Sequence, residues 1–503
     1  MTETAMISFS WIWGAAGALL HVLFVAFVVF HCLRTPREPR SSLLWIAITF
    51  AFPLIGFLFY LAVGINRMPA KRWRKKKSDQ TLWKFLSPEA SKGEVMQPSA
   101  CWREIARAPR PLLEAAYPRS LNRTLDRLGM HDSLLGGNAV QPLPDGTNAY
   151  PMMLKAIEEA THHIHLQSYI IAPDEAGHKL MDLLARRARE GVRVRVLYDS
   201  YGSAHASWVG FFRSYSSIPN MSVVAFKQAN ILRRQLQINL RNHRKLLIID
   251  GKTAFLGGLN ISDGNLGIGG MRGAIHDFHF KIQGPSVLEL QYTFLRDWYY
   301  MTEEDPETIL SAPYFPPFDL AGDVPMRVLN AGPTDEAFLG DVFFNLIAGA
   351  EKELLIVTPY FIPTEDLRSA LRSAALRGVD VRIMLPQKGN NWLAQHAARS
   401  FFEELLSSGV RIFERHPPFM HTKLIVADGS VVVLGSANFD TRSLHLNYET
   451  SMLVFDSSFG ERMKALLYAD LIQSSEVHLA DWQLRSASCR FRENFCALFS
   501  PVL

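Results

Sequence analysis

The chain opens with two long stretches that contain no charged side chain. The first extends from Thr4 to Leu33 and the second from Ser41 to Asn66, with the short segment "RTPREPR" between them. Each stretch is longer than the roughly 20 residues that a helix needs to cross the hydrocarbon core of a bilayer. A cleaved signal peptide has a shorter apolar region and a basic start, whereas Glu3 is the only charged side chain before the first stretch. The pattern therefore predicts two transmembrane helices within residues 1–66.

Positive charge is concentrated directly after these stretches. Seven basic residues and no acidic residue lie between Arg67 and Lys77, whereas the loop between the two stretches has three arginines and Glu38. Basic flanks favour the cytoplasmic side, so we expect the large C-terminal portion and the N-terminus to lie there. The same run would be attracted to anionic lipid headgroups. Residues 67–135 are predicted to form a basic juxtamembrane segment and a connector.

From residue 136 onward, strand-like and helix-like patterns alternate. The segment "GNAVQPLPDGTNAYPMMLKAIEEATHHIHLQSYII" predicts a strand, a turn, an amphipathic helix and a second strand, and "GDVFFNLIAGAEKELLIVTPYFIPTEDLRSALRSAALRGVDVRIMLP" repeats this order. Three landmarks recur in both halves: Tyr169 and Tyr360, Gly191 and Gly378, and His243 and His421. We therefore predict an α/β fold in which two duplicated units, 136–305 and 306–503, pack with pseudo-two-fold symmetry and share one site.

Composition narrows the class of protein. With 503 residues, 48% of them hydrophobic, the chain can bury a substantial core in more than one domain, and a net charge of +5 is too mild to indicate binding of nucleic acid. The four cysteines have no zinc-binding spacing, which favours a reduced, cytosol-facing catalytic portion. The cluster "HHIH" at 162–165 lacks a carboxylate or thiol placed to complete a metal site.

Two strand-like stretches carry polar residues at matched spacings. They are "LRNHRKLLIIDGKTAFLGGLNISD" and "FMHTKLIVADGSVVVLGSANFD". The first supplies His243, Lys245, Asp250 and Asn260, and the second supplies His421, Lys423, Asp428, Ser436 and Asn438. A His and a Lys two positions apart project from the same face of a strand. The repetition of all these spacings makes coincidence a poor explanation.

Two histidines, two lysines and amide donors suit the transfer of an anionic phosphoryl group. Ammonium and amide groups can neutralise the phosphate, while one imidazole attacks phosphorus and the other protonates the leaving oxygen. Each imidazole needs an acceptor for its other nitrogen, and Asp277 and Glu449 follow the two motifs in matching sequence. Asp250 and Asp428 are expected to fix the motif loops through hydrogen bonds.

These stretches resemble the paired His-Lys-Asp motifs of the phospholipase D superfamily. The chain as a whole is similar to the bacterial cardiolipin synthases with two N-terminal membrane spans. The segments "RNHRK", "TPYFIP", "GVDVRI", "HTKLIVADG" and "GSANFDTRSLHLNYE" carry this resemblance, together with Gly257-Gly258 in the first motif where the second has Gly435-Ser436. One departure is His276, at a position where the family has an Arg that could contact substrate.

The resemblance implies a mechanism and a location. His243 would be the nucleophile and His421 the general acid and then the general base, making cardiolipin and glycerol from two phosphatidylglycerol molecules through a phosphatidyl-histidine intermediate. Asp250 and Asp428 belong to the catalytic motifs. The residues implied to hold the phosphate are Lys245, Lys423, Asn260, Asn438 and Ser436. No cofactor or metal is implied, and the expected partners are phosphatidylglycerol, other anionic phospholipids and the bilayer of a bacterial inner membrane.

The residues leave several alternatives open. The same motifs serve a phospholipase D that uses water and releases phosphatidic acid, or a transferase with another donor or acceptor. A nuclease is disfavoured by the two spans and the mild charge, and an inactive membrane scaffold is disfavoured by the intact duplicate motifs. The run "ILRRQLQINLR" at 231–241 fits either a phosphate-steering stripe or a solvated lid. The oligomeric state is not specified.

Overall fold

The computed structural model describes residues 3–34, 39–64, 68–86, 99–128, 133–226, 240–267, 274–333 and 338–500. Most of the predicted stripe or lid, residues 231–239, lies outside these ranges. The chain divides into two compact units, Met1–Arg74 and Lys75–Leu503. Helix α4 (Met68–Leu86) crosses the division between them.

The first unit is a bundle of apolar helices. Helix α1 (Glu3–Arg34) packs against α2 (Pro39–Ala51) and α3 (Pro53–Phe59), which are followed by the π-helical turn η1 (Tyr60–Gly64). Phe24 stacks on Phe57 with ring centroids 4.3 Å apart, and His31 Nδ1 shares a hydrogen bond of 2.6 Å with the Tyr60 hydroxyl. Within α1, Ala16–Arg34 has a mean hydropathy of 2.3, and no other helix in the described part of the chain is long and apolar enough to cross a membrane.

The outward faces of this bundle are apolar. Large hydrophobic side chains that are more than half exposed include Leu19, Leu23, Phe30 and Leu33 of α1 and Leu43, Phe50, Leu54 and Ile55 of the following helices. Soluble proteins rarely expose contiguous apolar patches of this kind to water. These surfaces are therefore suited to contact with an apolar environment rather than with water.

The second apolar stretch is not the single continuous helix that the sequence predicts. The helix is interrupted at Phe52, whose φ of −132° and ψ of 77° are not helical. Pro53 has no N–H, and its ring disfavours the helical conformation of the residue before it. Hydrogen bonds continue on both sides of this point, because Phe52 N donates to Ile48 O (2.9 Å) and Gly56 N donates to Phe52 O (2.6 Å). The stretch from Pro39 to Gly64 is thus a kinked succession of helical segments.

The second unit contains one sheet made from two similar halves. The first half contributes β1 (Leu135–Pro144), β2 (His163–Ser168), β3 (Arg193–Asp199), β4 (Met221–Phe226), β6 (Leu246–Ile249), β7 (Thr253–Gly257) and β9 (Phe278–Gln283). The second half contributes β10 (Val324–Ala331), β11 (Glu353–Val357), β13 (Asp380–Pro386), β14 (Arg411–Arg415), β16 (Leu424–Ala427), β17 (Val431–Gly435), β19 (Asn447–Phe455) and β20 (Ser474–Val477).

The strand order confirms the predicted duplication. Strands β1 and β10 pair antiparallel where the halves meet. Outward from β1 the order is β9-β7-β6-β2-β3-β4, and outward from β10 it is β19-β17-β16-β11-β13-β14, with β20 at the edge. The halves are therefore related by a pseudo-two-fold axis between β1 and β10.

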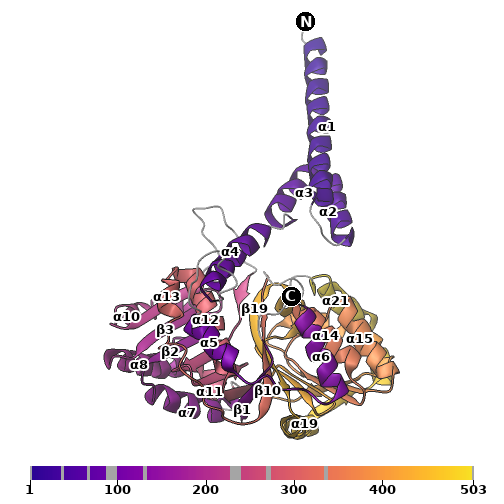
Figure 1. Ribbon diagram of the computed structural model, residues 1–503. Coiled ribbons are helices and arrows are strands. Elements are labelled where there is room, and N and C mark those ends of the chain that lie inside the picture. The colour runs from indigo at the N-terminus through magenta and orange to yellow at the C-terminus, as the bar shows by residue number, and fades with distance from the viewer. Residues whose placement is uncertain are drawn as a thin grey trace. The chain divides into compact units, whose positions relative to one another are not determined.

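Helices cover these strands on the outside and between the halves. The main helices are α7 (Asp145–Glu158), α8 (Glu175–Arg189) and α12 (Ser286–Thr302) in the first half and α14 (Phe338–Gly349), α15 (Glu365–Leu376) and α19 (Ser457–Ile472) in the second. Each half has its own outer core, and a third core is shared. The shared core includes Leu290 of α12 and Met463 of α19, whereas α8 and α15 lie on opposite outer sides (Figure 1). Burial on both faces explains the uninterrupted apolar runs of β6 and β16.

Shorter elements complete the second unit. The helices are α5 (Ala100–Arg107), α6 (Ala116–Arg127), α9 (Ala204–Trp208), α10 (Arg213–Ser216), α11 (Asp263–Leu266), α13 (Pro306–Ile309), α16 (Trp392–Arg399), α17 (Phe402–Leu406), α18 (Thr441–His445), α20 (Leu479–Gln483) and α21 (Ala487–Ala497). The strands are β5 (Arg241–Asn242), β8 (Ile275–His276), β12 (Phe361–Ile362), β15 (Phe419–Met420) and β18 (Phe439–Asp440).

Two of these short strands connect the halves. Strand β5 pairs in parallel with β19, and β15 pairs in parallel with β8. Each strand that precedes a motif histidine is therefore bound to a strand of the other half. This exchange places both motifs at the junction of the halves.

One basic residue of the juxtamembrane run is buried in the second unit. The Lys75 ammonium is fully buried and lies 2.7 Å from Asp79 Oδ1 and 3.3 Å from Asp297 Oδ1. Asp297, on α12, also forms an ion pair with Arg244, the residue between His243 and Lys245. A buried carboxylate requires compensating charge, so Lys75 serves this pair rather than lipid headgroups.

Candidate active site

The two halves enclose one cavity of about 460 Å³. Equivalent residues from both halves line it: His243 and His421, Asn260 and Asn438, and Tyr169 and Tyr360. The volume lies in the range of pockets that bind small organic ligands. The predicted histidines and asparagines are therefore brought together at one site.

His243 is oriented by a carboxylate of the second half. It directly follows β5, and its main-chain N–H donates to Tyr448 O (2.9 Å) on β19. Its Nδ1 lies 3.0 and 3.1 Å from the two carboxylate oxygens of Glu449, the next residue of β19. Glu449 is itself held by Ser436 Oγ (2.6 Å), Ser443 Oγ (3.0 Å) and Asn447 Nδ2 (3.1 Å). The carboxylate can only accept, so Nδ1 carries the proton and Nε2 is the basic nitrogen.

His421 is oriented in the same way by the first half. It follows β15, and its main-chain N–H donates to His276 O (2.7 Å) on β8. Its Nδ1 lies 2.8 Å from Asp277 Oδ2, between β8 and β9. The carboxylates predicted from sequence do orient the histidines, and the pairing is crossed: each half supplies the carboxylate for the histidine of the other.

The resting site holds neutral imidazoles beside ionised carboxylates. Burial, reinforced by the neighbouring lysines, lowers the pKa of His243 and of His421 to about 4. Burial alone would raise the pKa of Asp277, but Lys423 and His421 outweigh it and hold that pKa below its usual value. His243, Lys245 and Ser436 do the same for the pKa of Glu449. A neutral imidazole with a free Nε2 is the form that can act as a nucleophile or base.

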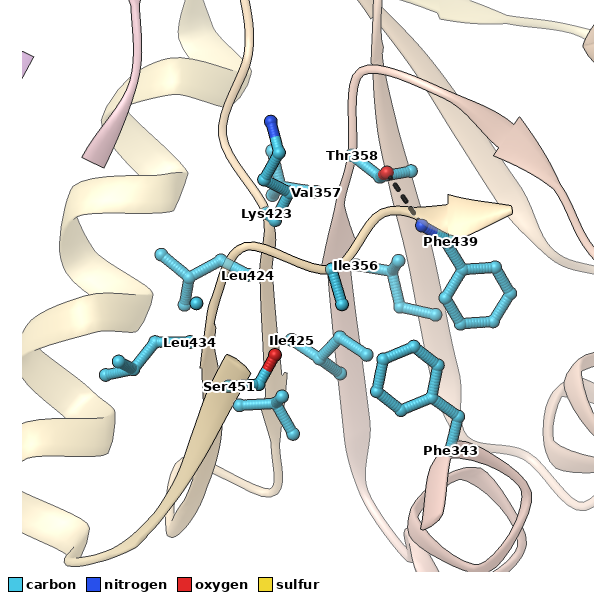
Figure 2. A pocket seen from close by; sticks show the side chains of 13 residues that line it. Phe343, Ile356, Val357, Thr358, Lys423, Leu424, Ile425, Leu434, Phe439 and Ser451 are labelled. Carbon is cyan, nitrogen blue, oxygen red and sulfur yellow. Dashed lines mark hydrogen bonds between the residues drawn. The ribbon is translucent and has the colours of Figure 1, made fainter. Parts of the chain in front are cut away.

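Each motif lysine contacts the main chain of the histidine two residues before it. Lys245 Nζ donates to His243 O (2.7 Å), and Lys423 Nζ donates to His421 O. Burial lowers the pKa of Lys245 to about 7 and that of Lys423 to about 8. Figure 2 shows the Lys423 amine pointing away from the apolar side chains that line a small void of about 10 Å³ in the second half, among them Phe343 and Ile425. Strand β16 is thus anchored in the core, and the residues directly before it carry the polar groups of the motif.

Ser436 and Gly258 occupy equivalent positions with different surroundings. The Ser436 hydroxyl is fully buried and donates to Glu449 Oε2, and the serine does not line the cavity. In the first half a Cβ added to Gly258 would lie 2.2 Å from Asp277 Oδ2, so the Asp277 carboxylate leaves no room for a serine at position 258. The geometry supports a role for Ser436 in holding Glu449, and its contact with phosphate stays a prediction.

Asp250 and Asp428 bind loops away from the cavity. Asp250 accepts hydrogen bonds from the main-chain N–H groups of Thr161, His162 and His163 (2.7–2.8 Å). Burial alone would raise its pKa, but these donors outweigh it and hold the pKa below its usual value. Asp428 accepts three equivalent bonds from residues 351–353 (2.8–3.0 Å). Hydrogen bonds of this kind are the ones expected from the sequence.

Removing the Asp428 carboxylate is expected to lower stability without disabling the site. Asp428→Ala leaves three main-chain donors unpaired and places alanine at a φ of 50°, so the free energy of unfolding should fall by ~2 kcal/mol or more. Asp428→Asn keeps an acceptor and tolerates this backbone conformation, so its loss should be smaller. Thermal unfolding in detergent measures the difference. A loss of activity from properly folded Asp428→Asn would instead indicate a chemical role.

Two other histidine groups are structural. Burial alone would lower the pKa of His276, but Asp145 (2.8 Å) and Asp470 (2.9 Å) outweigh it and raise that pKa to about 9. His276, where the family pattern has an Arg, therefore carries a positive charge, and this charge is directed at two carboxylates. In the "HHIH" cluster, His163 Nε2 and His165 Nδ1 share hydrogen bonds with the Gln291 amide, and no metal-binding cluster occurs among the described residues.

The sequence-based prediction missed several residues of the cavity wall. Tyr169 and Tyr360 served only as landmarks of the duplication, although their matched positions after equivalent strands could have assigned them to the site. Tyr201, Arg241, Asn447 and Arg442 also line the cavity. None of these four has a counterpart of the same type in the other half, so internal repetition does not mark them; Arg241 alone was included in a sequence-based hypothesis, as the last residue of the possible phosphate-steering stripe at 231–241.

Comparison with known proteins gives a family match in both halves. The family model described as "Cardiolipin synthase, PLD-like domain" matches residues 153–298 and 343–470. A second model, "Phospholipase_D-nuclease N-terminal", matches residues 22–64, across the first apolar stretches. The matched segments contain His243, Asp277, His421 and Glu449.

Relatives match along almost the whole chain. A cardiolipin synthase of Geobacillus kaustophilus is 35% identical over 96% of this chain and 92% of its own length. A cardiolipin synthase of Alkalihalophilus pseudofirmus is 34% identical over 98% of this chain and 95% of its own. Among solved structures, the phosphatidylserine synthase of Haemophilus influenzae is similar in fold, with a TM-score of 0.58, 16% identity, and coverage of 76% of this chain and 100% of that one.

Proposed function

Because the chain belongs to the cardiolipin synthase family of phospholipase D-like enzymes, we propose that it joins two phosphatidylglycerol molecules into cardiolipin and releases glycerol. It is an enzyme of the phospholipase D-type transferase class. The observation that carries the proposal is the pair of crossed contacts, His243–Glu449 and His421–Asp277, at one cavity.

The first step cleaves the donor lipid. His243 Nε2 attacks the phosphorus of one phosphatidylglycerol, and the bond from phosphorus to the headgroup oxygen breaks. His421 gives a proton to that oxygen, so glycerol leaves and a phosphatidyl-histidine remains. His421 is neutral in the empty site, and the anionic phosphodiester favours its protonated form when the lipid enters. Asp277 and Glu449 stabilise the imidazolium charge that develops on each ring.

The second step regenerates the enzyme. A hydroxyl of a second phosphatidylglycerol gives its proton to the now neutral His421 and forms a bond to phosphorus. The bond from phosphorus to His243 breaks at the same time, which releases cardiolipin. The anionic phosphate favours the protonated forms of Lys245 and Lys423, which then supply positive charge next to both histidines. The Asn260 and Asn438 side chains line the cavity where the phosphate oxygens would lie.

The first unit would hold the enzyme at its substrate. We infer that α1 crosses the bilayer as one helix and that the kinked stretch from Pro39 to Gly64 forms the second span. The exposed apolar side chains of this unit and the basic run that follows it support this topology, with the catalytic unit in the cytoplasm.

The test is product identification. Purified protein in mixed micelles is incubated with phosphatidylglycerol labelled in the acyl chains, and we expect labelled cardiolipin together with an equal molar amount of free glycerol. The catalytically disabled double variant His243→Ala/His421→Ala, purified in parallel, controls for contaminating enzymes. Phosphatidic acid as the sole labelled product would assign the protein to the hydrolytic phospholipases D and overturn the proposal.

A further inference from the structure

The cavity has two equivalent rims whose chemistry differs. Where β5 pairs with β19, Arg241 lies opposite Asn447, and where β15 pairs with β8, Phe419 lies opposite Ile275. Arg241 and Phe419 each precede a motif histidine by two residues, and all four side chains line the cavity. The duplicated fold thus places a polar pair beside one histidine and an apolar pair beside the other.

Two guanidinium groups face the cavity at the polar rim. The Arg241 guanidinium lies 3.6 Å from the ring centroid of Tyr201; among the described residues it forms no ion pair, although its positive charge acts on the pKa of Asp199. Arg442 lines the same cavity; burial and the neighbouring charge of Arg241 lower its pKa and outweigh the opposing effect of Asp440, which also lines the cavity. Like charges at one wall repel each other, and an anion bound between them would relieve this repulsion. Guanidinium groups bind phosphate oxygens through two parallel hydrogen bonds.

The polar rim also offers a buried acceptor. Asn447 is 5% exposed, and its Nδ2 donates to Glu449 Oε1, which fixes the orientation of the amide. Its Oδ1 is buried and has no hydrogen-bond partner among the described residues. Leaving a buried acceptor unpaired is unfavourable, so a ligand hydroxyl would be stabilised there.

We propose that Arg241 and Arg442 bind the phosphate of the acceptor phosphatidylglycerol, and that Asn447 Oδ1 accepts a hydrogen bond from the secondary hydroxyl of its headgroup. This assignment rests on the proposed function. The reacting primary hydroxyl of the acceptor gives its proton to His421 as its oxygen replaces His243 on phosphorus, and the acceptor phosphate keeps all its bonds. The subsite therefore selects the incoming molecule without taking part in the chemistry.

The spacing of the rim fits the product. Arg241 and His243 are two residues apart in extended chain, so their Cα atoms are ~6.6 Å apart. A three-carbon glycerol bridge separates the two phosphates of cardiolipin by a distance of the same order. Water has no phosphate and gains nothing from these contacts, so the subsite would favour lipid transfer over hydrolysis.

Two different acceptor molecules allow the contribution of this subsite to be measured apart from the cleavage step that both reactions share. Cardiolipin formation needs a phosphate-bearing acceptor, whereas exchange of labelled free glycerol into phosphatidylglycerol uses the same histidines and an acceptor without phosphate. In Arg241→Gln we expect the ratio of cardiolipin formation to glycerol exchange to fall about tenfold or more, as for loss of one charge-assisted hydrogen bond. Arg241→Lys should restore part of the ratio. Arg213→Gln, which removes an exposed charge elsewhere in the same half, is the matched control.

Each outcome has a defined meaning. An unchanged ratio in Arg241→Gln, with both reactions measurable, would overturn the acceptor subsite while leaving the synthase function intact. A parent enzyme that exchanges glycerol but makes no cardiolipin would instead overturn the proposed function. Millimolar inorganic phosphate, compared with chloride at equal ionic strength, separates the sources of the anion. A phosphate-induced fall of the ratio in the parent, absent in Arg241→Gln, is the competition expected if the rim holds the acceptor phosphate. Equal inhibition of both reactions by phosphate in the parent, again absent in Arg241→Gln, would assign the rim to free phosphate and overturn the lipid assignment.

Discussion

Replacing either cavity histidine with alanine is expected to lower cardiolipin formation by about 10⁴-fold or more. His243→Ala removes the nucleophile, so no phosphatidyl-enzyme can form. His421→Ala removes the group that protonates the leaving oxygen and later accepts the proton of the acceptor. Both residues are 8% exposed at one cavity and each is held by a carboxylate, and the described cavity wall contains no other histidine that could take their place.

Rapid acid quenching separates the two roles. With lipid labelled in the acyl chains, we expect label bound covalently to the parent protein and none bound to His243→Ala. Equal thermal unfolding midpoints would show that the variants are folded. Label retained by His243→Ala and lost from His421→Ala would exchange the assignments of nucleophile and acid. Substantial turnover by either folded variant would contradict the two-histidine mechanism altogether.

The second large effect concerns the crossed carboxylates. Glu449→Gln keeps the shape of the side chain and removes the negative charge that holds the proton on His243 Nδ1 and stabilises the ring when it becomes cationic. Loss of such a carboxylate is expected to lower kcat by about 10³–10⁴-fold. The KM for phosphatidylglycerol should change little, because Glu449 is fully buried and does not line the cavity.

This split between kcat and KM distinguishes orientation from stability. Asp277→Gln is a poor companion because it adds length next to Gly258, so Asp277→Asn is the matched variant in the other half. Glu476→Gln, which removes a carboxylate from a partly exposed ion pair with Arg411, controls for the general effect of losing a charge. A proportional loss of folded protein and activity in Glu449→Gln would reduce its role to a structural one.

The sequence was sufficient for the duplicated fold and for the side chains that the fold brings together at one cavity. Matched spacings located both His-x-Lys motifs and both carboxylates, because equivalent strands of a duplicated fold carry equivalent chemistry. The sequence could not determine that Glu449 orients His243 and that Asp277 orients His421. That pairing depends on the two parallel ladders between the halves, and each ladder is only two residue pairs long, which is too short to leave a periodic pattern in the sequence.

Other differences arise from single positions. The second apolar stretch has the composition of a membrane helix, but Pro53 interrupts it at Phe52, which the rule for residues before proline could have indicated. Lys75 has the sequence context of a lipid-facing residue, and only the fold reveals that Asp297 lies beside it. In both cases, composition described the segment correctly and one local interaction changed its structure.

The crossed carboxylates also bear on the order in which the protein is made. The first half leaves the ribosome before the second, with His243 and its lysine already in place but without Glu449, which follows 206 residues later. A nascent chain inserted in a membrane would be surrounded by the very lipids that it can cleave. Since the nucleophile acquires its carboxylate only after residue 449 has been synthesised and has folded against the first half, a product truncated before that point is expected to have little activity on the bilayer that holds it.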